Sequence, residues 1–119
     1  MTNLINMSER EYFAQFAKRT GMFIGSTSLT GATAFMTGYD EAAQRYGGPG
    51  LTGWREWLMA NHQVGTNLVW EAQVRQVALP AAQQGYRNLT PEEEAHVLKV
   101  LFELLDRFLA EREGTAPEQ

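Results

Sequence analysis

The chain has 119 residues, no cysteine and a formal net charge of −4 at pH 7. Its length suits one domain with an ordinary hydrophobic core, and the absence of cysteine excludes disulfides, thiol catalysis and cysteine-bound metals. The acidic balance disfavours nucleic-acid binding, which generally requires a basic face. No apolar run approaches the ~18 residues of a membrane span, and residues 1–7 are too polar for a secretory signal. We therefore expect a cytoplasmic protein that binds neither nucleic acid nor membranes.

The first predicted helix begins after Ser8 and ends near Arg19. Ser8 and Glu11 have the spacing of a capping box, in which each side chain satisfies the backbone N–H of the other residue. Aromatic and alanine side chains then recur at helical intervals, which predicts an amphipathic helix.

The stretch KRTGMFIGST, residues 18–27, follows this helix and fits no helical or strand period. Gly21 and Gly25 bracket the three apolar residues 22–24, which predicts a turn at each end and three side chains directed at the core. The N–H groups and hydroxyls after Gly25 also suit an anion site at the start of the next helix.

This stretch resembles the RKRPGMYIGST segment that precedes the nucleotide-binding helix in type II topoisomerase B subunits, with Thr20 in place of the family's proline and Phe23 in place of its tyrosine. The resemblance extends weakly to residues 40–42, where Asp-Glu-Ala matches an acidic triplet. It implies a similar loop and helix but no ATP hydrolysis, because Thr33 and Thr37 stand where the family has its catalytic glutamate and magnesium-binding asparagine. The family's Asp-x-Gly-x-Gly motif does not follow. The matching residues are Lys18, Arg19, Gly21, Met22, Ile24, Gly25, Ser26 and Thr27.

The middle of the chain predicts two further helices separated by a loop. Apolar residues recur every three or four positions over residues 29–46, and the GGPG run at 47–50 cannot continue a helix. A third helix is expected to begin near Thr52 and to carry Trp54 and Trp57 on one face.

The segment from residue 66 to residue 79 is open to two interpretations. Its apolar spacing favours a helix, whereas NLVW at 67–70 alone would suit a strand. We prefer the helix, which Pro80 would end.

The last predicted element is a helix of about 20 residues that ends near Arg112. Thr90 is its N-cap, Pro91 occupies the first helical position and Glu93 completes a capping box. Its apolar stripe is wide enough to contact two neighbours, and part of it could instead form a homodimer seam. Core packing within one chain is the favoured use. The stripe consists of Val97, Leu98, Leu101, Phe102, Leu104, Leu105, Phe108 and Leu109.

These elements together predict an all-α fold. We expect a compact single-domain bundle of four or five helices over residues 1–112, with the glycine-bounded loop between the first two helices. Residues 113–119 form a polar tail that we expect to be disordered.

Residues suited to catalysis or metal binding are sparse. His96 lies on the polar side of the last helix, and His62 lies at a helix C-terminus, where a histidine commonly interacts with free carbonyls. Asp40 and Glu41 are adjacent, so on a helix they point ~100° apart and do not form a facing carboxylate pair. We expect no metal site and no cofactor, and we favour a binding protein over an enzyme.

The leading functional hypothesis is a small protein-binding module that covers a basic partner protein, as an immunity or antitoxin protein does. Acidic charge speeds association with a basic partner, and tryptophan is enriched at protein interfaces. The expected contact residues are Asp40, Glu41, Trp54 and Trp57.

Two alternatives stand beside this hypothesis. One is a small helical enzyme or small-molecule-binding protein, whose pocket would be lined by Met22, Phe23, Phe35 and Met36 together with the two tryptophans of the third helix. The other is a homo-oligomeric scaffold built on the last helix.

Overall fold

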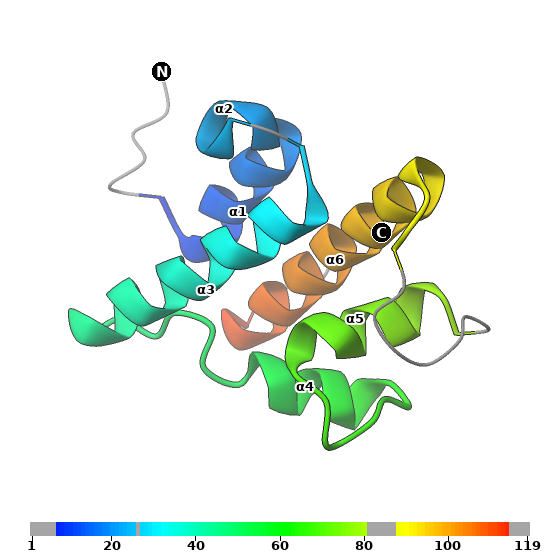
Figure 1. Cartoon of the computed structure of the whole chain (residues 1–119). Coiled ribbons are helices and arrows are strands. Elements are labelled where there is room, and N and C mark those ends of the chain that lie inside the picture. Colours follow the sequence, from blue (N-terminus) through cyan, green and yellow to red (C-terminus); the bar gives the residue numbers. More distant parts are fainter. Residues whose placement is uncertain (1–6, 26, 81–87, 115–119) are drawn as a thin grey trace.

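In this computed structural model, residues 7–25, 27–80 and 88–114 are described (Figure 1). They form six α-helices, and no strand occurs among them, so the predicted all-α fold is confirmed. The helices are α1 (Glu9–Lys18), α2 (Thr20–Ile24), α3 (Leu29–Arg45), α4 (Trp54–Asn61), α5 (Trp70–Ala78) and α6 (Pro91–Arg112).

Helix α6 is the central packing element. It runs between α1 and α3 on one side and α4 and α5 on the other, and it contacts all four (Figure 1). Its apolar stripe is buried in every turn from Val97 to Leu109. Residues of those four helices pack against the stripe and form one hydrophobic core with it. The predicted stripe therefore contacts neighbours on both sides. Its most buried members are Val97, Leu101, Leu105 and Leu109.

Both predicted capping boxes are present. The Ser8 hydroxyl accepts the N–H of Glu11 at 3.1 Å, and the Glu11 carboxylate accepts the N–H of Ser8 at 3.0 Å. Thr90 and Glu93 make the same reciprocal pair at the start of α6, at 3.1 and 2.9 Å. These local signals explain why α1 and α6 begin where the sequence predicts.

The remaining helices differ from the expected bounds by a few residues. Helix α3 ends at Arg45 rather than at the GGPG loop, and α4 begins at Trp54, directly after Gly53, rather than near Thr52. The segment 66–79 is helical only from Trp70, and its NLVW run forms no strand.

The prediction for residues 18–27 is wrong in one respect, because the stretch contains the short helix α2. Only Gly25 breaks the helix; its φ of 78° is in the left-handed region that favours glycine, and its N–H donates to Gly21 at 2.9 Å. Consecutive helical residues point ~100° apart, so three in a row cannot all face the core. Phe23 and Ile24 pack against the core, whereas Met22 is 77% exposed.

The predicted disordered tail falls mainly outside the described residues, which end at Gly114. Its first residue, Glu113, is the C-cap of α6, and its carboxylate accepts the N–H of Arg10 at 3.2 Å. Glu113 thus belongs to the folded part of the chain rather than to the tail.

Candidate functional site

A surface groove of about 550 Å³ lies between α1 and α6. The two helices are antiparallel, because Arg10 near the start of α1 contacts Asp106 in the later part of α6, whereas Ala17 lies beside Leu98. Phe13 and Phe16 are buried against the core, whereas Ala14, one position after Phe13, is exposed beside the groove. The groove is lined by Phe13, Ala14, Ala17, Phe102 and Leu105, and by Arg10, Glu11, Lys18, Glu103 and Asp106.

One pair of charges ties the two helices together. The Arg10 guanidinium donates to the Asp106 carboxylate from Nε at 2.8 Å and from Nη2 at 3.0 Å. Such a bidentate pair fixes the orientation of both side chains. The helices that form the groove are therefore held in register before anything binds.

The other charged residues described here, Glu11, Lys18, Lys99 and Glu103, are exposed, and the two glutamates lie at a different end of the groove from the two lysines. Glu11 bonds to the N–H of its own capping partner, and those hydrogen bonds from Ser8 lower the pKa of its carboxyl, so it is ionised at neutral pH. Lys18, Lys99 and Glu103 make no side-chain hydrogen bond or ion pair within the described residues. Because α1 and α6 are antiparallel, Glu11 and Glu103 lie toward one end of the groove, and Lys18 and Lys99 lie toward the other. We call this arrangement the charge polarity of the groove. Glu94 also lies at the lysine end, where its carboxylate is bound to the N–H of Leu29.

Two adjoining hollows, of about 500 and 420 Å³, continue the groove past the end of α1. Both share Ala17 with the groove, and both are bordered by Thr20 and Thr27. The exposed Met22 lines the first of them. The Thr20 side chain is itself buried, and its hydroxyl donates to the carbonyl of Phe16 at 2.9 Å, which joins α1 to α2.

The predicted anion site at the start of α3 is occupied by the chain itself. The N–H of Leu29 donates to the Glu94 carboxylate of α6 at 2.7 Å, and the N–H of Gly31 donates to the Ser28 hydroxyl at 3.0 Å. A carboxylate and a hydroxyl thus already accept two of the N–H groups that would attract a phosphate, and the carboxylate lies at the positive end of the helix dipole.

The two threonines matched to topoisomerase catalytic positions bond to their own helix. Thr33 donates to the carbonyl of Thr30 at 3.1 Å, and Thr37 donates to the carbonyl of Thr33 at 3.0 Å. Ser26, within the resembling stretch, lies outside the described residues.

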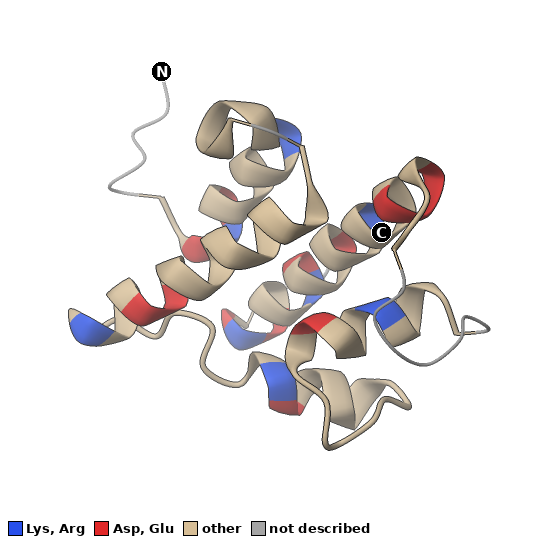
Figure 2. Cartoon of the chain, viewed as in Figure 1, with Lys and Arg blue, Asp and Glu red and all other residues tan. Residues whose placement is uncertain are grey.

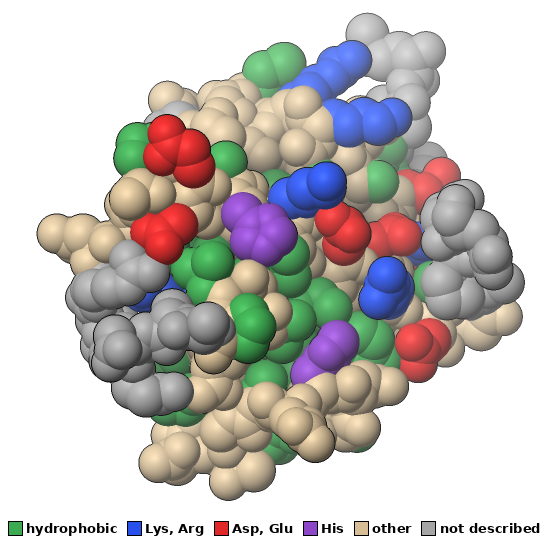
Figure 3. Space-filling model, turned by 90° about the vertical axis from the view of Figure 1, so that its right-hand side faces the viewer, with side chains coloured by type: hydrophobic (Ala, Val, Ile, Leu, Met, Phe, Trp, Pro, Cys, Tyr) green, Lys and Arg blue, Asp and Glu red, His purple; other side chains and the backbone are tan. Residues whose placement is uncertain are grey.

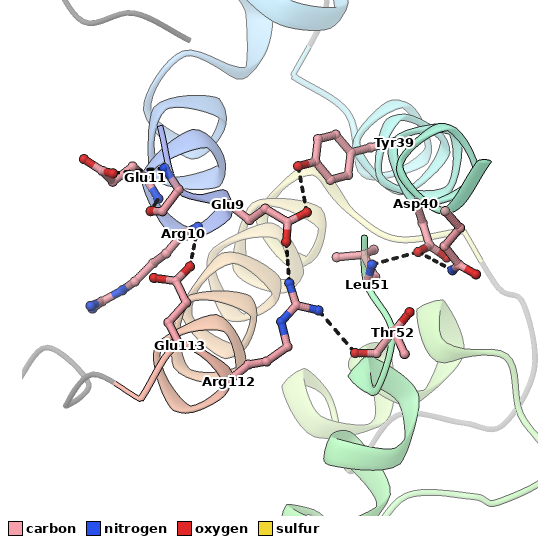
Figure 4. Close-up of polar contacts among 11 residues, drawn as sticks. Glu9, Arg10, Glu11, Tyr39, Asp40, Leu51, Thr52, Arg112 and Glu113 are labelled. Carbon is pink, nitrogen blue, oxygen red and sulfur yellow. Dashed lines mark hydrogen bonds and ion pairs between the residues drawn. The ribbon is translucent and has the colours of Figure 1, made fainter. Parts of the chain in front are cut away.

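The four residues predicted to contact a partner do not form one surface. Trp54 is only 1% exposed, and its ring stacks on that of Trp57 with centroids 6.0 Å apart. Trp57 is half-buried, and its Nε1 donates to Glu111 at 3.1 Å. Asp40 binds the N–H of Leu51 at 2.7 Å (Figure 4). The adjacent Glu41 is exposed.

The four residues of the predicted ligand pocket line no common hollow among those described above, although the rings of Phe23 and Phe35 contact each other. Met36 is fully buried in the core, and Phe35 stacks on Phe16 with centroids 4.4 Å apart. Phe23 contacts the same rings edge-on, whereas Met22 points to solvent. Of these residues, only Met22 lines one of the three hollows described above.

A polar network that the sequence did not indicate joins α1, α3 and α6. Glu9 accepts from Arg112 Nη2 at 2.6 Å and from the Tyr39 hydroxyl at 2.8 Å, and Arg112 also donates to the carbonyl of Thr52 at 3.2 Å (Figure 4). Burial, together with the hydrogen bond to Glu9, raises the pKa of Tyr39. No local pattern could reveal this network, because Glu9 and Arg112 are 103 residues apart.

Both histidines lie on one face, with hydrophobic side chains between them (Figure 3). His96 Nε2 lies 3.1 Å from the carbonyl of Ala78, and the His62 ring packs edge-on against Trp57 with centroids 5.8 Å apart. His62 is the C-cap of α4, as its predicted position at a helix end requires. Basic and acidic residues are interspersed over the helices rather than separated into one basic face (Figure 2).

The described residues contain no group of three or more histidine, aspartate or glutamate side chains that could hold a metal ion. None of the helices in this part of the chain combines the length and hydropathy needed to cross a lipid bilayer. Comparison with known protein families, with curated proteins and with solved structures gives no match to this chain.

Proposed function

We propose that this chain is a small protein-binding module that docks a partner through the groove between α1 and α6. The observation that carries the proposal is the charge polarity of the groove above an apolar floor. Glu11 and Glu103 lie toward one end, Lys18 and Lys99 toward the other, and Ala14 lies between them.

Each part of this surface has a physical role in docking. The apolar floor supplies area whose burial favours association, and the small side chains of Ala14 and Ala17 let a partner helix approach closely. Exposed charges of opposite sign orient the partner and raise the association rate more than the final affinity. The groove therefore suits an amphipathic helix that carries the opposite order of charges.

The immunity- or antitoxin-type inhibitor expected from composition is one form of this module. Its net charge of −4 supports association with a basic partner. Of its expected contacts, Glu41 is exposed and Trp57 is half-buried, but neither lines the groove, so docking through the groove does not use them. Trp54 is buried and Asp40 is bound to Leu51, so neither supports this form of the proposal.

Site-specific photo-crosslinking in the cells that naturally make the protein tests the proposal. A photoreactive phenylalanine derivative replaces Ala14 in the groove and, as a matched control, Ala42 on the exposed face of α3. We expect one discrete crosslinked product from position 14 and none from position 42. Adding Glu11→Lys, which disturbs the charge polarity, should reduce the yield at position 14. The absence of any product at position 14, or equal products at both positions, would contradict the proposal.

A further inference from the structure

We infer that the occupant of the groove is a second copy of this chain, in a twofold-symmetric dimer whose two α1 helices cross antiparallel at Ala14. The inference rests on the proposed function, because it uses the same groove. The order of charges along α1 and α6 identifies the partner as a second copy of the chain.

The outward face of α1 is complementary to itself. Glu11, Ala14 and Lys18 are separated by three and four positions, so they lie on one face of the helix, and all three are exposed. A twofold axis that brings residue i of one copy to residue j of the other also brings j to i. With the crossing at Ala14, each Glu11 faces Lys18 of the second copy, which forms two equivalent ion pairs.

On α6, the pair Glu103 and Lys99 repeats this order on the other side of the groove, and Glu94, beyond Lys99, is bound to the N–H of Leu29. Glu103 lies with Glu11 toward the acidic end, and Lys99 lies with Lys18 toward the basic end. The twofold rotation therefore opposes acidic and basic ends on both helices. A parallel arrangement would place like charges together, which is unfavourable, so the same residues also select the orientation.

The seam is suited to close helix packing. Ala14 carries only a methyl group, and packed helices approach to about 8 Å when the contact residues are small. The pair between Arg10 and Asp106 already fixes α1 against α6, so association does not have to order the groove. Met22, exposed beside the basic end, adds apolar surface next to the seam.

Sedimentation equilibrium of the purified chain tests the inference by charge exchange. We expect the unaltered protein to reach twice its 13.4 kDa mass, and Glu11→Lys or Lys18→Glu alone to weaken the dimer by about tenfold or more. Mixing the two single variants should restore the dimer, because every facing pair is then again of opposite sign. The double variant should restore it for the same reason. If the groove bound a different protein instead, neither mixing the single variants nor combining both changes in one chain would restore association.

Matched variants separate the seam from folding. Glu11→Gln keeps the capping box, which glutamine also forms, and removes only the charge, so it should weaken the dimer less than Glu11→Lys. Glu41→Lys makes the same charge change on the exposed surface of α3 and should leave the dimer unchanged. Circular dichroism confirms that each variant is folded.

The outcomes distinguish this inference from the proposed function. A monomer at concentrations up to about 0.1 mM, or a dimer unaffected by both single reversals, would overturn the inference. If position 14 then crosslinks to a different protein, the proposed function stands with another partner. If position 14 crosslinks to nothing and the chain is monomeric, both fail.

Discussion

The carboxylate of Asp40 accepts the backbone N–H of Leu51 at 2.7 Å and thereby closes the GGPG loop between α3 and α4. The loop is closely fitted to this carboxylate, because a Cβ on Gly50 would lie 2.5 Å from Asp40 Oδ1. Asp40→Ala removes a charged acceptor from a partly buried N–H. We expect it to lower the free energy of unfolding by about 1.5 to 3 kcal/mol, measured by urea denaturation.

Glu41→Ala is the matched control for this prediction. It removes the same charge from the next residue, which is exposed, and surface substitutions of this kind usually change stability by less than about 0.5 kcal/mol. Equal effects of the two substitutions would show that Asp40 does not hold the loop.

Glu94 provides a second test of a long-range contact, because it binds the first N–H of α3 from the first turn of α6. Glu94→Ala should cost about 1.5 kcal/mol more than Glu92→Ala in the same denaturation assay. Both substitutions remove a favourable charge near the N-terminus of α6, so their difference isolates the bond to Leu29. A smaller loss for Glu94→Ala than for Glu92→Ala would contradict the structure here.

Tyr39 should make stability depend on alkaline pH. Burial, and then the hydrogen bond to Glu9, raises its pKa in the folded protein above the ordinary value of 10.0. The folded state thus keeps the proton after the unfolded state has lost it, so the stabilisation is complete below pH 10 and is lost as pH rises toward the folded-state pKa. Absorbance at 295 nm should show Tyr39 as the last tyrosine to ionise, after Tyr12, whose pKa burial also raises.

Two variants identify that late titration. Tyr39→Phe should remove the late component and flatten the fall in stability above pH 10, because the phenol is gone. Glu9→Gln should shift the component toward lower pH, since the neighbouring charge and the acceptor both raise the pKa of Tyr39. A late component that persists in Tyr39→Phe would assign it to another tyrosine.

The features that the sequence predicted correctly are local ones. Ser8 with Glu11, and Thr90 with Glu93, are three residues apart, so a capping box can be recognised without knowledge of the fold. Helix α2 was missed because Gly21 and Gly25 were both taken as breaks, whereas of these two only Gly25 has a positive φ.

The contacts that define the candidate site are non-local, and no pattern reveals them. The groove depends on Arg10 meeting Asp106, 96 residues later. The start of α3 is closed to anions by Glu94, 65 residues from the N–H that it binds. Sequence spacing placed the charged residues on their helices but could not show which helix faces which.

Trp54 and Trp57 show the same limit and supply the last prediction. Their spacing puts both on one stripe of α4, but only the packing of α5 and α6 decides that Trp54 is 1% exposed and Trp57 half-buried. Trp54→Ala should cost about 3 to 5 kcal/mol in guanidinium denaturation, because it leaves a large cavity. Trp57→Ala should cost clearly less, since part of its ring already contacts water, although it loses the bond to Glu111 and the stacking on Trp54. If Trp57→Ala is as destabilising as Trp54→Ala, Trp57 is a core residue and is not accessible to a partner.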